Sequence, residues 1–143
     1  MEYLESVVKE TLRIHPVVQT ILRKLLQDAV VDGYQLPRGT VVHSSQYVIH
    51  RLEGVWEEPE RYNPDRWSKG FIPAPFTYLP FFAGPRRCIG RNFAMLELKC
   101  ILCELLKKFT IGGTDMGPIR SQQGVLCFPV GNNFSFEPRV CSS

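Results

Sequence analysis

The chain has 143 residues, the length of one domain, and its 44% hydrophobic, 11% aromatic and 22% charged residues exclude a disordered chain and predict a packed core. The net charge of +3 is too small to indicate nucleic-acid binding. The first residues, 1–5, already include acidic side chains, unlike a signal peptide, and no apolar run approaches the roughly 18 residues of a membrane span.

The first predicted element is a helix from Met1 to Ile14, which Pro16 would end. Apolar residues recur there at steps of three and four, as they do on one face of a helix. These residues are Leu4, Val7, Val8 and Leu12.

Short strands are predicted next. Asp32-Gly33 lies between the β-prone runs 30–31 and 34–36, which favours a hairpin. A second turn at 37–39 leads into residues 40–42, so we expect a small sheet.

The middle of the chain is predicted to be largely irregular. A short helical turn is expected from Ser44 to His50. Residues 56–85 then show no sustained period, yet they are rich in aromatic residues, which argues against disorder. We expect this meander to wrap around something in the folded protein.

A long helix from Arg91 to Phe109 is predicted next, and the Gly112-Gly113 pair should close it. Apolar residues cover most of its circumference, so we expect it to be largely buried. Two tail strands, 125–128 and 134–136, are expected to be joined by a turn at 131–133.

The segment from Phe81 to Gly90 carries the most specific chemical signal. It places Cys88 just before the long helix, where unpaired N–H groups and the positive dipole end favour a thiolate. Gly84 and Gly90 would let the backbone approach a flat cofactor or adopt a positive φ. The alternative interpretation of Cys88, which would be the usual one for a lone cysteine, is a buried side chain that serves only packing.

This segment resembles the haem loop of the cytochrome P450 family, F-x-x-G-x-R-x-C-x-G. All five fixed positions match, at Phe81, Gly84, Arg86, Cys88 and Gly90. Phe82 departs from the family, which usually has a small or polar residue there, and we expect altered loop packing with ligation intact. The resemblance implies haem b as the cofactor, with Cys88 as the iron ligand. The other haem-binding residues it implies are Arg86, Arg23, Phe81, Gly84, Ile89 and Gly90.

Two further motifs match the family. Glu10-Thr11-Leu12-Arg13 resembles its E-x-x-R helix motif, and Pro64-Asp65-Arg66-Trp67 its P-E-R-F motif, with Trp in place of Phe. The pair at i and i+3 shares one helix face but is weak evidence alone. The resemblance implies a Glu10, Arg13 and Arg66 network that locks the meander under the haem loop.

Arg23 stands ten residues after Arg13, where the family commonly has an arginine that binds a haem propionate, and Arg86 has a similar implied role. An arginine suits a carboxylate through its bidentate fork. A surface arginine is the alternative for Arg23.

The resemblance implies a monooxygenase that inserts one oxygen atom from O2 into a lipophilic substrate, because a thiolate ligand favours O–O cleavage. Electrons would come from a separate NADPH-dependent reductase or another donor, docked on the face beside Arg87, Arg91 and Lys99. Residues 17–21 and 126–130 would contact substrate. A haem-thiolate isomerase or dehydratase, which needs no electron donor, and a non-catalytic module remain as alternatives.

The resemblance further implies a mainly α fold with small β-sheets, the C-terminal haem-binding part of the P450 fold. Residues 1–143 would be an incomplete portion of one domain, without the central oxygen-activating helix. We expect such a fragment neither to fold fully nor to turn over by itself. The likeness to microsomal members places the full-length protein in the endoplasmic reticulum membrane, anchored only through an upstream segment.

Other cysteine and histidine patterns are weaker. Five cysteines predict reduced thiols rather than a disulfide framework. Cys100 and Cys103 form a C-x-x-C in mid-helix, and we expect core packing because a second pair is missing. The histidines, at 15, 43 and 50, show no metal-ligand spacing.

Overall fold

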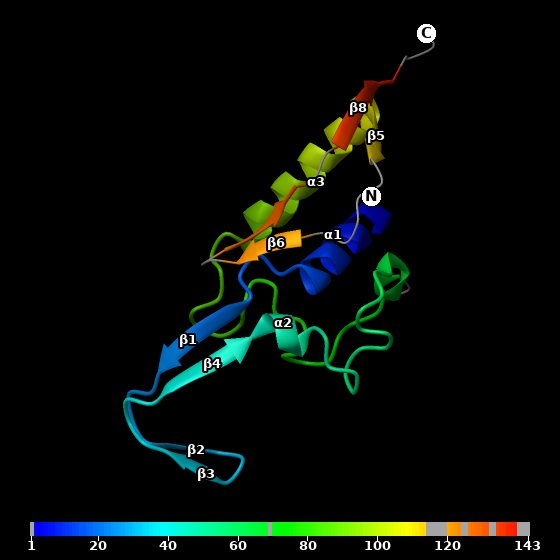
Figure 1. Cartoon of the computed structure of the whole chain (residues 1–143). Coiled ribbons are helices and arrows are strands. Elements are labelled where there is room, and N and C mark those ends of the chain that lie inside the picture. The colour runs from blue at the N-terminus through cyan, green and yellow to red at the C-terminus, as the bar shows by residue number, and fades with distance from the viewer. Residues whose placement is uncertain (1, 69, 114–119, 124–125, 132–133, 140–143) are drawn as a thin grey trace.

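The computed structural model describes residues 2–68, 70–113, 120–123, 126–131 and 134–139. Two long helices that lie against each other organise the fold, α1 (Glu2–Ile14) and α3 (Arg91–Lys108) (Figure 1). The other elements are β1 (Thr20–Lys24), β2 (Ala29–Val31), β3 (Tyr34–Leu36), β4 (Val41–Ser45), α2 (Gln46–Ile49), the 3-10 helix η1 (Pro64–Trp67), β5 (Phe109–Gly113), β6 (Arg120–Gln123), β7 (Cys127–Val130) and β8 (Phe134–Pro138).

Helix α1 confirms the first prediction and supplies much of the core. It begins with Glu2 and Glu5 in its first turn and ends with Arg13 in its last, charges that match the helix dipole. Val8 and Leu12 are buried, as the apolar spacing predicts. Polar Glu10 and Arg13 are buried as well, so α1 presents charge as well as apolar surface to the interior.

The predicted hairpin is confirmed as β2–β3. Its turn residues have φ of 50° at Asp32 and 79° at Gly33, the two left-handed conformations of the hairpin turn that Asp-Gly favours. Strand β4 pairs instead with β1, from Thr20 opposite Ser45 to Lys24 opposite Val41. These strands and the hairpin extend away from the helices (Figure 1).

An aromatic core lies between α1 and the meander. Trp56 and Trp67 are 2% and 8% exposed, and the ring centroids of Trp67 and Tyr78 are 4.6 Å apart. The meander is irregular as predicted, apart from η1, which Asn63 caps by accepting a hydrogen bond from the N–H of Asp65. The packed aromatics explain how a segment with so little regular structure keeps one conformation.

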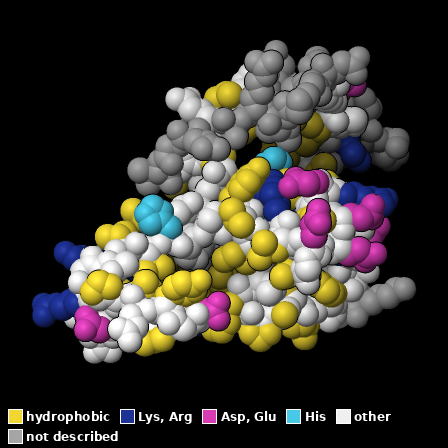
Figure 2. Space-filling model, turned by 60° about the horizontal axis from the view of Figure 1, so that its bottom comes forward, with side chains coloured by type: hydrophobic (Ala, Val, Ile, Leu, Met, Phe, Trp, Pro, Cys, Tyr) yellow, Lys and Arg dark blue, Asp and Glu magenta, His cyan; other side chains and the backbone are white. Residues whose placement is uncertain are grey.

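Helix α3 forms as predicted, but it ends at Lys108, and Gly112 and Gly113, which were expected to close it, lie in β5. The expectation that α3 is largely buried is also wrong. No residue of α3 is buried in the described structure, and Phe93 and Leu96 are 70% and 59% exposed. Its apolar residues surround the helix, whereas α1 and β5 make most of its contacts with other elements. Exposed hydrophobic side chains also gather on the face seen in Figure 2. None of the described helices could cross a membrane, since none is both long and apolar enough.

The two expected tail strands are present as β7 and β8, and each pairs with an earlier strand. β8 pairs with β5, from Phe109 opposite Pro138 to Gly113 opposite Phe134, and β7 pairs with β6. Part of the predicted turn, residues 132–133, lies outside the described residues. The N–H of Cys127 donates to the carbonyl of Val17 (2.8 Å), so β7 is held against the segment that follows α1.

Candidate functional site

The loop before α3 folds back on itself around Cys88. The N–H of Cys88 donates to the carbonyl of Phe81 (2.9 Å), and the N–H of Arg87 donates to that of Gly84 (3.1 Å). Gly84 has a φ of 76°, one of the two uses expected of the loop glycines. The Cys88 thiol is free and exposed at the end of this turn.

The backbone at Phe82 and Gly90 adds detail to the sequence-based expectations, and Gly90 does not have the positive φ that was one of its two expected uses. Phe82, the departure from the family motif, has a φ of 61°, a left-handed conformation that is uncommon for residues with a side chain. Gly90 has an ordinary φ of −84° as the residue that caps α3. A Cβ at Gly90 would lie 3.9 Å from the Cys88 sulfur, an ordinary van der Waals distance, so the position directly adjoins the thiol.

The surroundings of Cys88 suit a flat, largely apolar cofactor with an anionic rim. Ile89 is fully exposed beside the thiol, and Phe93, one turn into α3, is 70% exposed. A cavity of about 200 Å³ adjoins the sulfur, lined by Arg87, Cys88, Ile89, Arg91 and Asn92. A haem-thiolate site needs an accessible sulfur, and the exposed apolar side chains and guanidinium groups near Cys88 fit the apolar ring and the anionic propionates of haem.

Glu10 accepts hydrogen bonds from four residues, one on its own helix and three at the 3-10 helix η1 and its cap. Arg13 approaches it with Nε (3.0 Å) and Nη2 (2.9 Å), and Arg66 with Nε (3.0 Å). The N–H of Asn63 (2.9 Å) and the indole N–H of Trp67 (2.8 Å) complete the set. Burial alone would raise the pKa of Glu10, but these hydrogen bonds together hold that pKa below its usual value.

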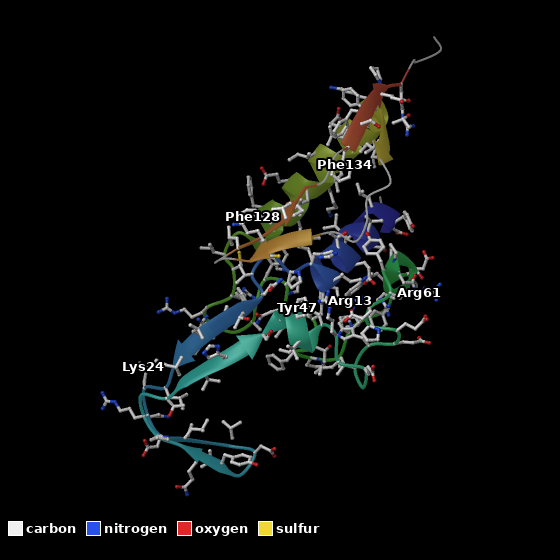
Figure 3. The ribbon with its side chains drawn as sticks, in the orientation of Figure 1. Arg13, Lys24, Tyr47, Arg61, Phe128 and Phe134 are labelled. Atoms are coloured by element: carbon white, nitrogen blue, oxygen red, sulfur yellow. The ribbon has the colours of Figure 1, made fainter. Side chains whose placement is uncertain are left out.

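Arg13, labelled in Figure 3, is fully buried, yet each of its five donor N–H groups has an acceptor. Besides the two bonds to Glu10, Nη1 donates to the carbonyls of His50 (2.8 Å) and Pro59 (2.7 Å), and Nη2 to that of Arg61 (3.2 Å). The network therefore fastens the meander backbone as well as the two ion pairs.

Arg66 extends the same arrangement. Its Nη1 donates to the carbonyl of Glu57 (3.0 Å), and its Nη2 lies 3.4 Å from the carbonyls of Glu58 and Arg61. The structure thus brings Glu10, Arg13 and Arg66 together as one network. Sequence reasoning missed the hydrogen bonds that Asn63 and Trp67 donate to Glu10. The indole N–H of Trp67, at the last position of the P-E-R-F match, was a visible signal.

His50, which the sequence analysis set aside, is a further buried member of this region. Its Nδ1 lies 3.1 Å from the carbonyl of Arg13, and its Nε2 accepts the N–H of Leu79 (2.8 Å). Burial, together with the charges of Arg13 and Arg51, lowers the pKa of His50 to about 4. His50 is therefore neutral at physiological pH.

We expect the free energy of unfolding to fall by about 3 kcal/mol between pH 6.5 and pH 4 through His50 alone. The unfolded chain takes up a proton at His50 below its usual pKa of 6.5, whereas the folded chain resists until about 4. Denaturation at a series of pH values measures this slope, and His50→Gln should flatten it. Burial and the charge of Arg51 also lower the pKa of His15. A His15→Gln variant is therefore measured in parallel. An unchanged slope in His50→Gln would contradict the assignment.

The remaining predicted residues lie on exposed parts of the structure. Arg23 is exposed on β1, and its Nη1 donates to the carbonyl of the neighbouring Leu22 (2.9 Å). Arg86, Arg87 and Arg91 are exposed at the loop and the start of α3. Lys99 pairs with Glu5 (3.3 Å), so part of its charge is neutralised.

The two expected substrate-contacting segments are linked through backbone and side-chain bonds. Besides the Val17 carbonyl that accepts from Cys127, the Gln19 amide lies 3.3 Å from the Cys127 sulfur. Residues 17–21 and the described residues 126–130 therefore lie side by side.

The expectation that both cysteines of the C-x-x-C pack in the core is wrong for Cys100. Cys100 is exposed and Cys103 is half-buried, because the face of α3 that carries Cys100 is uncovered. Within the described residues, no three His, Cys, Asp or Glu side chains gather as a metal site.

Comparison with known proteins identifies what this geometry resembles. The family model described as Cytochrome P450 matches residues 1–136. Similar curated proteins include cytochrome P450 3A29 of Sus scrofa, 43% identical over 112 residues (77% of this chain, 22% of the relative). Cytochrome P450 3A13 of Mus musculus is 39% identical over 131 residues (88% and 26%). The mitochondrial cholesterol side-chain cleavage enzyme of Hypanus americanus is 38% identical over 126 residues (88% and 24%).

Solved structures show the same fold. The chain superimposes on the cytochrome P450DA heme domain with a TM-score of 0.89 and 28% identity, covering 96% of this chain and 31% of that one. Retinoic acid-bound cyanobacterial CYP120A1 gives a TM-score of 0.88 at 27% identity, covering 97% and 33%. The chain therefore spans about a quarter of the length of these curated relatives and about a third of these solved domains.

Proposed function

The chain belongs to the cytochrome P450 family, and from this we propose that residues 1–143 form the C-terminal, haem-binding portion of one P450 domain that acts as a monooxygenase. The observation that carries the proposal is the exposed Cys88 thiol at the end of a loop that matches the family motif at all five fixed positions. The uncovered apolar surface of α3 supports the proposal that further sequence completes the domain.

In this proposal Cys88 holds the iron of haem b as a thiolate. Arg86 and Arg23 bind the propionates, and Phe81, Gly84, Ile89 and Gly90 shape the surface against the ring. Haem with a thiolate ligand supplies O–O cleavage and oxygen insertion. The protein contributes the fixed position of the sulfur, because the Phe81 carbonyl holds the Cys88 amide and the Glu10 network holds the segment behind it.

Oxygen incorporation distinguishes this proposal from an isomerase or dehydratase of the same fold. The haem-loaded full-length protein, given NADPH, a reductase and lipophilic substrates under 18O2, should release a product that carries one labelled oxygen atom. Product formation from a peroxide without any electron donor would favour the isomerase or dehydratase. No product in either assay, with haem bound, would indicate the non-catalytic alternative.

The lipophilic substrate is proposed from the chemistry of the two segments that would contact it. Residues 17–21 include Val17 and Ile21, and residues 126–130 include Leu126 and Phe128, both groups largely apolar. For the full-length protein we propose the endoplasmic reticulum membrane. One similar protein is named as mitochondrial. Co-staining of the full-length protein with markers of the endoplasmic reticulum and of mitochondria decides between the two locations.

An electron donor is proposed to dock beside the Cys88 loop, where Arg87 and Arg91 are exposed. We expect Arg87→Glu to slow reduction of the haem-loaded full-length protein by about threefold to tenfold at low ionic strength, since charge steers association. Stopped-flow reduction over a range of salt concentrations measures the effect. Arg38→Glu, in the turn between β3 and β4, is the matched control. Equal rates in the two variants would exclude this docking face.

A further inference from the structure

His50 links the buried ion network to the segment that leads into the Cys88 loop. It lies at the C-terminal end of α2 and is fully buried. Arg13 holds it twice, since the Arg13 guanidinium donates to the His50 carbonyl (2.8 Å) and the Arg13 carbonyl lies 3.1 Å from His50 Nδ1. On the other side of the ring, Nε2 accepts the N–H of Leu79 (2.8 Å).

These contacts fix the tautomer of the ring. Because Leu79 donates its N–H to Nε2, that nitrogen carries no proton, and the proton of the neutral ring is on Nδ1, from which it is donated to the Arg13 carbonyl. The rings of Trp56 and Tyr78 pack beside the imidazole. The charged groups that face it are the guanidinium groups of Arg13 and Arg51, which disfavour a second proton.

The hydrogen bonds continue from Leu79 to the cysteine. The Leu79 carbonyl accepts the N–H of Phe82 (3.1 Å), whose φ of 61° turns the chain sharply. The neighbouring Phe81 carbonyl accepts the N–H of Cys88 (2.9 Å). One short segment, 79–82, thus connects the imidazole with the amide of the proposed iron ligand.

We propose that His50 is a positioning residue for the Cys88 thiolate, and that its neutral imidazole transmits the position of the Glu10–Arg13 network to the haem loop through Leu79. The proposal rests on the proposed function, because it concerns the same cysteine. His50 does not touch the haem surface in this account and takes no part in proton transfer to substrate. Its role depends on one atom, Nε2, as the acceptor for the Leu79 amide.

Two substitutions of His50 distinguish the hydrogen bond made by Nδ1 from the hydrogen bond made by Nε2. In His50→Asn the short side chain can still donate to the Arg13 carbonyl but cannot reach Leu79. In His50→Gln the longer side chain carries an oxygen close to the place of Nε2, where it can accept the Leu79 N–H. His43→Asn, on exposed β4, is the control for a histidine without this role.

The first measurement is hydrogen exchange of segment 79–82 in the protein without haem. We expect exchange of the Leu79 amide to be about fivefold faster in His50→Asn, the effect of losing one hydrogen bond, and close to the parent rate in His50→Gln. The second measurement is the carbon monoxide difference spectrum of the haem-loaded full-length protein, and the full-length protein is used for both measurements. His50→Asn should convert much of the thiolate-type band into the thiol-type band, and His50→Gln should retain the thiolate-type band.

Equal behaviour of the Asn and Gln variants in both measurements would overturn the proposal, because a general packing role does not distinguish the two side chains. A parent protein that binds haem without a thiolate-type band would refute the proposed function instead. In that case the exchange rates still test the link through Leu79, so the two failures are distinguishable.

Discussion

Replacing Glu10 by glutamine should destabilise the protein by about 3–5 kcal/mol, the usual effect of removing one partner from a buried ion pair. Glu10 is fully buried and accepts five hydrogen bonds, three of them from Arg13 and Arg66. The amide of glutamine would direct N–H donors towards other donors and leave two guanidinium groups without their counter-charge. Such a loss is a large part of the total stability of a domain, roughly 5–15 kcal/mol.

The chain contains a matched control for this substitution. Glu58 and Arg61 also form an ion pair at i and i+3, with an N–O distance of 2.8 Å against 2.9 Å for Glu10 and Arg13. Their side chains are 58% and 64% exposed, whereas those of Glu10 and Arg13 are 0% exposed. Glu58→Gln should therefore cost less than about 1 kcal/mol. Denaturation followed by tryptophan fluorescence compares the two variants, and similar losses would contradict the role given to burial.

The local elements could be predicted from the sequence because their signals are local. The apolar spacing of α1, the Asp32-Gly33 turn and the start of α3 after Gly90 each depend on neighbouring residues. The pairings of β1 with β4 and of β5 with β8 join residues far apart in the chain. No turn residue marks such pairings, and so the sequence indicated two tail strands and a connecting turn without indicating the partner of either strand.

The burial of α3 shows a second limit of sequence reasoning. Apolar residues around a helix predict that it will be covered, but they do not say which element covers it. In the described structure α1 lies against one side, while Phe93 and Leu96 remain exposed. The extent of burial depends on the partners of the helix, which its own sequence does not contain.

The candidate site was predicted in part. Motif positions identified Cys88 and the members Glu10, Arg13 and Arg66, which the structure joins in hydrogen bonds. The carbonyl acceptors of the meander could not be predicted, because a backbone carbonyl has no sequence signature. His50 was missed because a histidine was judged by metal-ligand spacing, whereas its contacts are to backbone groups.

Substitution of Cys88 should have the largest effect on function. A serine at this position keeps the size of the side chain and the loop hydrogen bond to Phe81, which uses the backbone N–H. An alcohol is a far weaker ligand for iron than a thiolate, so the protein should fold as before and lose thiolate ligation and oxygen insertion. Because Cys88 is exposed, the substitution should change stability by no more than about 0.5 kcal/mol.

The carbon monoxide difference spectrum of the reduced, haem-loaded full-length protein tests the central claim most directly, with Cys100→Ser as a control for loss of another exposed thiol. The parent protein and Cys100→Ser should both give the band of a thiolate-ligated haem, and Cys88→Ser should lack that band. A thiolate-type band that persists in Cys88→Ser would show that the iron ligand lies elsewhere.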